Sequence, residues 1–355
     1  MLIGSELINQ ESPTYFIAEI GSNYDGSFKR ALKLIDIAKD SGANAVKFQH
    51  YTAESLVSDE GFRKIGKQLG HQKEWKGSVF EVYNKASLNK DWTRELQQYS
   101  KGKGLGFLTS PYSKELIDYT TEFLDAIKIG SGDITWTEII EYASKQKKPI
   151  LLGTGASDIN DVDNAVKAIT KHNNELCIMQ CNTNYEGKKE DFKYQNLLVL
   201  KEYKKRYPSA LLGLSCHMPG HLSVLASVSL GAKIIEKHFT DDNSRTGPDH
   251  KFAMNPKDWE KMVNETRDLE SLLGNRIKKV EKNEIETSIV QRRSIRLNKD
   301  MKEGETINKQ NLDILRPCPK DAIKPSEIKL VLGKKLKNNL NKGDAIYKKD
   351  LFIES

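Results

Sequence analysis

The sequence predicts a (β/α)8 barrel, the TIM barrel architecture, followed by a small, mostly β domain. Two observations predict this arrangement. Over residues 15–240, short apolar runs alternate with longer amphipathic stretches, which is typical of an α/β protein with a parallel sheet. Beyond residue 285 this alternation stops, and a short unit with a glycine turn occurs twice.

The apolar runs of the first part are expected to form parallel strands, because each is followed by a stretch with helical spacing. Eight such units typically close into a barrel within ~250 residues. An open, doubly wound sheet is the alternative, but no Gly-rich dinucleotide loop follows the first run. The expected strands are 15–22, 45–49, 106–111, 126–132, 150–156, 176–182, 211–217 and 233–240.

The stretches between the expected strands carry helix signals. KRALKLIDIAKDSG ends near Gly42 and VLASVSLG ends at Gly231, and glycine is common just after the last helical turn. Region 50–100 is too long for one strand–helix connection and contains the aromatic segment HQKEWKGSVFEVYNKASL. In a barrel this insertion lies on the active-site face, so we expect it to form a lid or an oligomer contact.

The end of the chain shows an internal repeat. EGETINKQNL (303–312) matches KGDAIYKKDL (342–351), with a glycine, an isoleucine three residues later and a leucine eight residues later. We predict a barrel domain over 1–284, a linker over 285–292 and a compact domain over 293–355. A domain this small buries little core alone, so it is expected to pack on something else, such as a second subunit.

Composition excludes several classes of protein. The net charge of +7 comes from lysines scattered beside acids, as in KKVEKNE, which indicates a solvated surface and no nucleic-acid partner. No apolar run approaches the ~18–20 residues that span a bilayer, and the first ten residues lack a signal-peptide pattern, so no membrane association is expected. Four cysteines in 355 residues do not form a disulfide framework, and a cytoplasmic location is expected.

Polar residues collect where the expected strands end. In a barrel the catalytic groups lie at these carboxyl ends, so their side chains form the predicted site. The candidates are Glu19, Lys47, Gln49, Ser110, Lys128, Ser131, Asp133, Thr154, Asn182, Tyr185, Ser215, His217, Glu236, His238, Arg245 and Asp249.

Two lysines among these candidates indicate an anionic ligand. Lys47 and Gln49 are two residues apart, so they share one face of their strand and point into the barrel mouth. A lysine there needs a partner, and with Lys128 and several hydroxyl groups nearby a carboxylate or phosphate is predicted. The alternative for each lysine taken singly is a structural ion pair or a side chain that reaches solvent.

Two histidines end neighbouring strands. His217 and His238 would face each other beside carboxylates, which favours a divalent metal over two hydrogen-bonded core histidines. Two protein ligands leave positions open, as in a catalytic metal site. Cys216 alternates to the other face of its strand, so a Cys–His nucleophile pair is not expected. His221 is predicted to be a surface residue.

Taken in order, AEIGSNYDG, AVKFQ, FLTSPYS, IKIGSGD, CNTNY, GLSCHMPGH, IIEKHFT and GPDH resemble motifs of the sialic acid synthase family. That family comprises the N-acetylneuraminate, legionaminate and pseudaminate synthases and their spore-coat polysaccharide relatives. RRSI, LRP and LGKKL resemble its antifreeze-like (SAF) domain. The resemblance covers essentially the whole chain.

The resemblance implies a transferase that forms a carbon–carbon bond between phosphoenolpyruvate and an N-acylated hexosamine, such as N-acetylmannosamine, and releases phosphate. It implies a divalent metal, Mn2+ or Mg2+, on His217 and His238. Lys47 and Lys128 would bind phosphoenolpyruvate, with Ser131 and either Asn182 or Thr183 nearby.

The family's first-strand glutamate matches Glu19, and the aspartate of its GPD motif matches Asp249. From the general chemistry, Glu19 is expected to orient or deprotonate a water molecule. Arg316 matches the SAF-domain arginine, which in the family reaches the neighbouring subunit's barrel and contacts the sugar. A domain-swapped homodimer is therefore implied.

Three motifs depart from the family pattern. GLSCHM stands for GLSDHT, LGTG for LSTG and RPCPK for RPGTG, which puts Cys216, Gly153 and the loop after Arg316 in question. Loss of an aspartate that supports a metal ligand can cost ~10–100-fold in activity. The alternatives are a catalytically impaired barrel kept as a carbohydrate-binding or assembly subunit, and a related aldolase or ketoacid synthase. The acceptor sugar stays open, and loops 50–100 and 183–195 are expected to select it.

Overall fold

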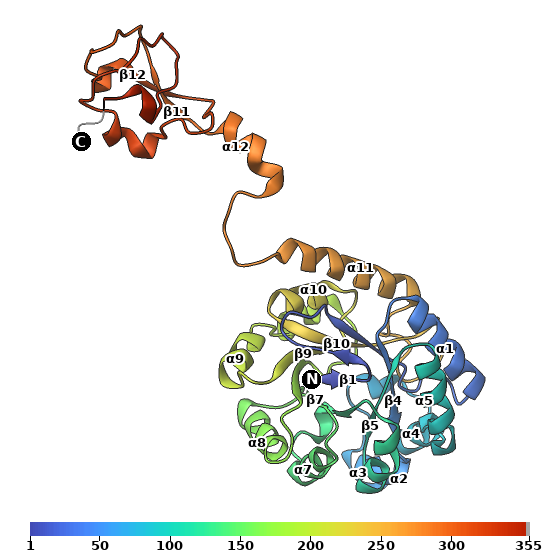
Figure 1. Cartoon of the computed structure of the whole chain (residues 1–355). Helices are drawn as coiled ribbons and strands as arrows, with labels where there is room; N and C mark the ends of the chain where they lie inside the picture. Colours follow the sequence, from blue (N-terminus) through green and yellow to red (C-terminus); the bar gives the residue numbers. More distant parts are fainter. Residues whose placement is uncertain (353–355) are drawn as a thin grey trace. The chain divides into compact units, whose positions relative to one another are not determined.

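A computed structural model of the chain describes residues 1–352. It divides into two compact units, Met1–Gly274 and a second that begins at Asn275 (Figure 1). The sequence places the domain boundary at 284, somewhat later than this division.

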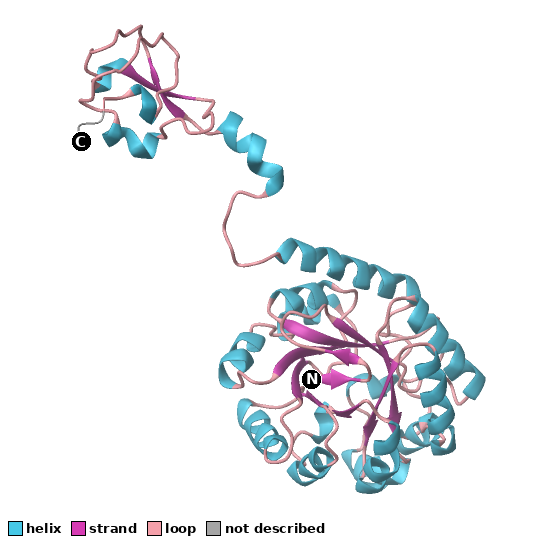
Figure 2. Ribbon diagram, in the orientation of Figure 1, coloured by secondary structure: helices cyan, strands magenta, loops and turns pink. Residues whose placement is uncertain are grey.

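The first unit is a closed barrel of eight parallel strands in the order β10-β3-β4-β5-β6-β7-β8-β9, which confirms the predicted fold class. Figure 2 shows the ring of strands inside a ring of helices. Each expected apolar run forms one strand. The strands are β3 (Tyr15–Glu19), β4 (Ala45–His50), β5 (Gly106–Pro111), β6 (Ala126–Ile129), β7 (Ile150–Gly153), β8 (Leu176–Cys181), β9 (Leu211–Cys216) and β10 (Ala232–His238).

The helices pack their apolar faces on the outside of the barrel. In α1 (Phe28–Asp40), the Ser27 side chain accepts a hydrogen bond from the Arg30 amide at the start, and Gly42 takes a φ of 91° just after the end. The other helices around the strands are α5 (Thr93–Gly102), α6 (Lys114–Thr120), α7 (Thr137–Lys145), α8 (Ile159–Thr170), α9 (Val199–Arg206), α10 (Leu222–Ser229) and α11 (Pro256–Leu273).

The lower half of the barrel interior is filled by apolar side chains. Side chains alternate along a strand, so every second residue points into the barrel. These inward residues form one buried cluster, which contains Tyr15, Ile17, Ala45, Leu108, Ala126, Leu151, Cys177, Met179, Leu211 and Ile234. A hairpin that the sequence analysis does not predict, β1 (Leu2–Ile3) with β2 (Glu6–Leu7), adds Ile3 and Ile8 to this cluster. Figure 1 shows the N-terminus at the centre of the ring of strands.

The insertion after β4 contains three short helices, α2 (Ala53–Leu56), α3 (Asp59–Ile65) and α4 (Val79–Ala86). A 3-10 turn, η1 (Gly70–Glu74), lies between α3 and α4. Because β4 ends at the upper face of the barrel, the insertion is placed beside the barrel mouth.

The second unit contains helix α12 (Ile285–Gln291) and the antiparallel pair β11 (Ser294–Leu297) and β12 (Leu312–Leu315). Most of the expected linker 285–292 is thus helical. The repeated sequence gives two equivalent turns, in which Gly304 and Gly343 have φ values of 82° and 90°. The isoleucines three residues later, Ile307 and Ile346, are both fully buried in this unit's own core.

Candidate active site

A cavity of about 380 Å³ opens at the carboxyl ends of the barrel strands. It is the place where a barrel carries its catalytic groups. Most of the predicted site residues line it, from β3, β4, β5, β6, β9 and β10 and from the loops that follow the strands. These residues are Glu19, Lys47, Gln49, Ser110, Lys128, Ser131, Asp133, Tyr185, Ser215, His217, His238 and Asp249.

The floor of this cavity is a buried group of two lysines and two glutamates. Lys47 Nζ lies 2.7 Å from Glu19 Oε2 and 3.7 Å from Glu236 Oε1. Lys128 Nζ donates to Glu236 Oε1 at 2.8 Å and to Oε2 at 3.0 Å. None of the four is more than 4% exposed. We call Glu19, Lys47, Lys128 and Glu236 the charged floor.

Sheet register brings the charged floor together. Glu19 pairs in register with Lys47 on β4 and with His238 on β10, and Glu236 lies two residues below His238. All of these side chains point inward, immediately above the apolar cluster. Buried ammonium and carboxylate groups stay charged only when they are paired, and here two cations face two anions. An arriving anion can therefore contact both lysines.

Burial sets the protonation of the carboxyl groups. Burial raises the pKa of Glu19 to about 7, although the nearby Lys47 ammonium favours the charged form. Burial also raises the pKa of Asp249 to about 6, although a hydrogen bond of 3.2 Å from Ser22 Oγ lowers that pKa in part. The pKa of Asp133 is raised to about 6 by burial. Raised values of this kind suit groups that exchange protons near neutral pH.

The two histidines at the top of β9 and β10 are neutral, so each can offer the lone pair of one ring nitrogen to a metal ion. Burial lowers the pKa of His217 to about 4 and that of His238 well below its usual value. His217 Nδ1 lies 2.9 Å from the Asn182 carbonyl oxygen. A carbonyl only accepts, so Nδ1 carries the proton and Nε2 keeps its lone pair.

His238 offers a second nitrogen. Its Nδ1 is buried without a hydrogen-bond partner and lies 3.6 Å from Asp249 Oδ2. The two imidazole centroids are 5.4 Å apart. This donor set fits a divalent cation held by two imidazoles, with its other positions open. Within residues 1–352, no three His, Cys, Asp or Glu side chains form a ligand set by themselves.

Aromatic residues form one wall of the cavity and connect the insertion to the histidines. His71 contacts Trp75 and Tyr185, with ring centroids 5.3 and 4.7 Å apart, and Tyr185 lies 4.2 Å from His217. Tyr83 continues the wall from Trp75 at 5.7 Å. The insertion thus supplies an amphipathic surface beside the charged floor, of the kind that packs against sugar rings and acyl groups.

Within the first unit, four predicted residues, Thr154, Asn182, Thr183 and Arg245, do not line this cavity. Thr154, Asn182 and Thr183 line a separate cavity of about 730 Å³. The inward position of β7 is Gly153, where an added Cβ would meet Ser131 Oγ at 2.9 Å, so Thr154 turns away and donates to the Met179 carbonyl. The Asn182 side chain donates to the Tyr194 carbonyl. Arg316 belongs to the second unit.

Some residues of the cavity have no role that the sequence predicts. Glu236 is among the candidates at the strand ends, and its two-residue spacing from His238 predicts that it points into the barrel mouth, but no chemical role is predicted for it; it lies in the charged floor. Ser22, which donates to Asp249, follows the predicted first strand without any distinguishing signal. His71, Trp75 and Tyr83 of the insertion could not be placed individually, because their position depends on how the insertion folds over the mouth.

Cys216 lies on the outer face of β9, as alternation predicts. Its Sγ is 3.1 Å from Ser223 Oγ and 3.3 Å from Lys237 Nζ. Lys237 is only 2% exposed and donates to the Met218 carbonyl at 2.7 Å. Within the part of the chain that the structure describes, no carboxylate pairs with Lys237. This buried ammonium is therefore neutralised less well than those of the charged floor.

Comparison with known proteins agrees with this geometry. The model of the NeuB family matches residues 34–278, and that of the SAF domain matches residues 292–351. N,N'-diacetyllegionaminic acid synthase of Legionella pneumophila is 31% identical over 94% of this chain and 93% of its own length. Pseudaminic acid synthase of Campylobacter jejuni is 30% identical over 99% of both chains.

A solved structure shares the architecture. The crystal structure of N-acetylneuraminic acid synthetase from Leptospira borgpetersenii superposes with a TM-score of 0.69 at 27% identity and covers 78% of this chain and 90% of that one. The family model spans well over half of the chain, and the SAF model covers residues 292–351 near its C-terminal end. The chain therefore belongs to the NeuB family and carries a C-terminal SAF domain.

Proposed function

We propose that this chain condenses phosphoenolpyruvate with an N-acylated hexosamine and water, giving a nine-carbon 2-keto acid sugar and phosphate. A bond forms between the enol methylene carbon and the aldehyde carbon of the sugar. Water then adds to the former C2 of phosphoenolpyruvate, and phosphate leaves. The observation that carries the proposal is that the two buried lysines of the charged floor line the same cavity as two neutral histidines.

Lys47 and Lys128 are the proposed ligands of the phosphate and carboxylate groups. Both ammonium groups already lie in the floor, so they need little reorganisation when an anion arrives. The Ser215 hydroxyl, 3.5 Å from Lys128 Nζ, and the Ser110 hydroxyl, 3.4 Å from Lys47 Nζ, extend this group of donors. Together they hold the phosphate and carboxylate groups of the substrate against the inner wall of the barrel.

His217 and His238 are the proposed ligands of a divalent metal, Mn2+ or Mg2+. When bound, such an ion polarises the sugar aldehyde as a Lewis acid. The Asn182 carbonyl fixes the His217 ring so that Nε2 faces the ligand. Tyr185 and Phe252 pack on the imidazoles at centroid distances of 4.2 and 4.9 Å and restrict water there.

Glu19 is the proposed base for the attacking water. Its raised pKa of about 7 makes it a better proton acceptor than an exposed carboxylate, and Gln49 Nε2 donates to its Oε1 at 2.7 Å to orient it. Asp249, whose Oδ2 lies 3.6 Å from His238 Nδ1, is the proposed contact of the sugar. The retention of this whole set disfavours a binding-only barrel.

The active assembly is proposed to be a domain-swapped homodimer, in which Arg316 reaches the cavity of the second copy. The end of the first unit exposes Leu272 at 83%, and the start of the second exposes Ile277 and Val290. Exposed apolar side chains of this size favour a partner surface. Light scattering should give twice the mass of the chain, and a monomeric mass at assay concentration would contradict this arrangement.

The test of the reaction is identification of its product. Purified protein with Mn2+ and phosphoenolpyruvate is incubated with N-acetylmannosamine, its 6-phosphate and a 2,4-diacetamido trideoxy hexose, and products are analysed by mass spectrometry. One acceptor should gain the mass of pyruvate with equimolar phosphate release. His217→Ala is the matched control. Phosphate release without a condensed sugar would contradict the proposal.

A further inference from the structure

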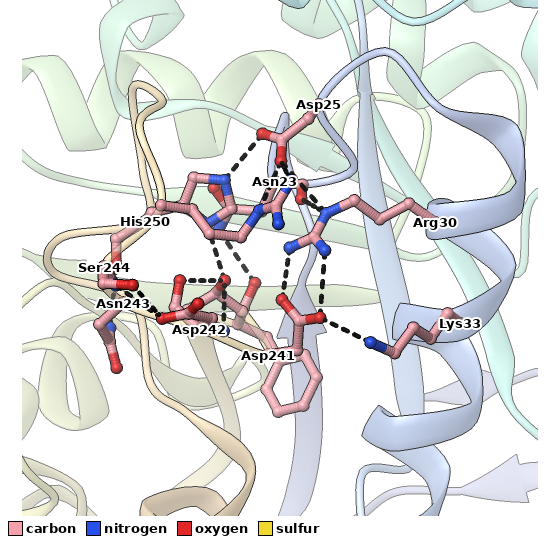
Figure 3. Close-up of polar contacts among 12 residues, drawn as sticks. Asn23, Asp25, Arg30, Lys33, Asp241, Asp242, Asn243, Ser244 and His250 are labelled. Carbon is pink, nitrogen blue, oxygen red and sulfur yellow. Dashed lines mark hydrogen bonds and ion pairs between the residues drawn. The ribbon is translucent and has the colours of Figure 1, made fainter.

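A network of polar contacts joins the loop after β3 to the loop after β10, outside the cavity (Figure 3). His250 Nε2 lies 2.8 Å from Asp25 Oδ1. Arg245 Nε donates to Asp25 Oδ2 at 2.8 Å, and Arg30 Nε lies 3.2 Å from the same oxygen. Arg30 also pairs with Asp241 at the start of the second loop. Asp25 therefore links the two loops, because it contacts residues of both.

His250 is the buried centre of this network, with no exposed surface. Its Nδ1 lies 2.7 Å from Thr240 Oγ1, so both ring nitrogens are engaged. Asn243 Nδ2 donates to the His250 carbonyl at 2.8 Å and to the Ala253 carbonyl at 2.7 Å. These hydrogen bonds join the beginning of the loop after β10, at Asn243, to its end at residues 250–253.

Asp249 directly precedes His250 and points the other way, into the cavity. Its carboxylate accepts a hydrogen bond of 3.2 Å from the Ser22 hydroxyl and another from the Ser22 backbone, and its Oδ2 lies 3.6 Å from His238 Nδ1. The fit is also tight, since a Cβ added to Gly21 would lie 3.0 Å from Asp249 Oδ2. The carboxylate can keep these contacts with Ser22 only if its own backbone stays in place, and that backbone is anchored at the next residue by the buried His250 side chain.

We infer that the Asp25–His250 pair is a positioning device that holds the Asp249 carboxylate at the substrate. His250 acts through Asp249 and touches no reacting atom. This inference rests on the proposed function, in which Asp249 contacts the sugar. It assigns a part in the reaction to Asp25 and His250, which lie outside the predicted set of site residues.

A double-mutant cycle separates this role from a purely structural one. His250→Ala is expected to lower kcat by ~10–100-fold, with the KM for phosphoenolpyruvate within about twofold, because a misplaced group costs turnover. In an Asp249→Ala background the same change should cost less than about twofold. His250→Gln, which keeps one donor for Asp25, should recover part of the loss and guards against a variant that fails to fold.

Lys33→Ala is the matched control, because Lys33 pairs with Asp241 at the exposed edge of the same network. It should leave kcat within about twofold. Equal losses from His250→Ala with and without Asp249 would overturn the inference.

Crystal structures of the wild type and of His250→Ala give a readout that does not need activity. Loss of the Ser22–Asp249 contact in the variant is expected, and an unmoved carboxylate would overturn the inference. If the wild type shows no condensation, the proposed function fails, and this contact still decides whether the pair positions Asp249.

Discussion

The interior of this barrel has two layers built on the same strands, and they differ completely in chemistry. The lower layer is apolar and closed by the N-terminal hairpin. The upper layer is the charged floor with its two histidines. On β10 the change takes two residues, from Ile234 in the lower layer to Glu236 in the upper one.

The comparison teaches that the two layers carry separate tasks. The lower layer removes apolar surface from water, which stabilises the fold at roughly 25 cal/mol per Å² of apolar area. The upper layer contributes little net stability, because the desolvation of four buried charges offsets much of their attraction. Substitutions in the two layers should therefore move activity and stability independently.

The largest expected effect is on activity, from Lys128→Met in the upper layer. It removes a phosphoenolpyruvate ligand of the proposed site and leaves Glu236 with Lys47 at 3.7 Å and the Ser215 hydroxyl at 3.3 Å. Loss of one preorganised donor costs ~10²–10³-fold in turnover, and we expect at least that for a cation. Phosphate release kinetics measure it. Activity within threefold of the wild type would refute a role in binding the anion.

The next effect is on stability, from Ile234→Ala in the lower layer. Ile234 is fully buried, and such truncations cost ~2–5 kcal/mol. Denaturant unfolding should show this loss, while kcat at 25 °C stays within about threefold. A loss of activity as large as that of Lys128→Met, in protein that is still folded, would show that the layers are not independent.

The pH dependence sharpens the comparison, because one group should move activity and stability in opposite directions. Burial raises the pKa of Glu19 from its ordinary 4.5 to about 7, so the folded protein favours the protonated form. Its contribution to stability is complete below pH 4.5 and is lost as the pH rises through 7. A base must be ionised, so kcat should rise about tenfold per pH unit below 7 and level off above it. Glu19→Gln should remove both dependences.

The smallest effect is expected outside the barrel wall, at Cys216→Asp. The new carboxylate would give the buried Lys237 ammonium a charged partner where the thiol now lies at 3.3 Å. Desolvation of the aspartate offsets part of this attraction, and we expect the free energy of unfolding to rise by about 1 kcal/mol. Cys216→Asn has the same shape without the charge and is the control. Equal stability of the two variants would show that Lys237 needs no carboxylate.

The fold was predictable because each strand is a continuous apolar run bounded by glycine or polar residues. Alternation within the strands also predicts that Lys47 and Gln49 share a face, and both line the cavity. The hairpin of residues 2–7 escaped prediction because its strands are two residues long and carry no periodic signal.

The site was less predictable where it depends on loops. Thr154 and Asn182 follow their strands as expected. Side-chain direction alternates from one residue to the next, and both residues point to the outer side, where they line the same separate cavity. The aromatic wall and the Asp25–His250 pair join segments far apart in the chain. Only tertiary folding brings such residues together, so no local pattern could indicate them.

The most direct test of the central claim is phosphate release from phosphoenolpyruvate by metal-stripped protein as Mn2+ is added back with the acceptor present. The account predicts no release without metal, a saturable rise with added metal, and no rise for His217→Ala. Release that is unchanged by metal removal, or no release by folded, metal-loaded protein with any N-acylated hexosamine, would contradict the assignment of the upper layer as a synthase site.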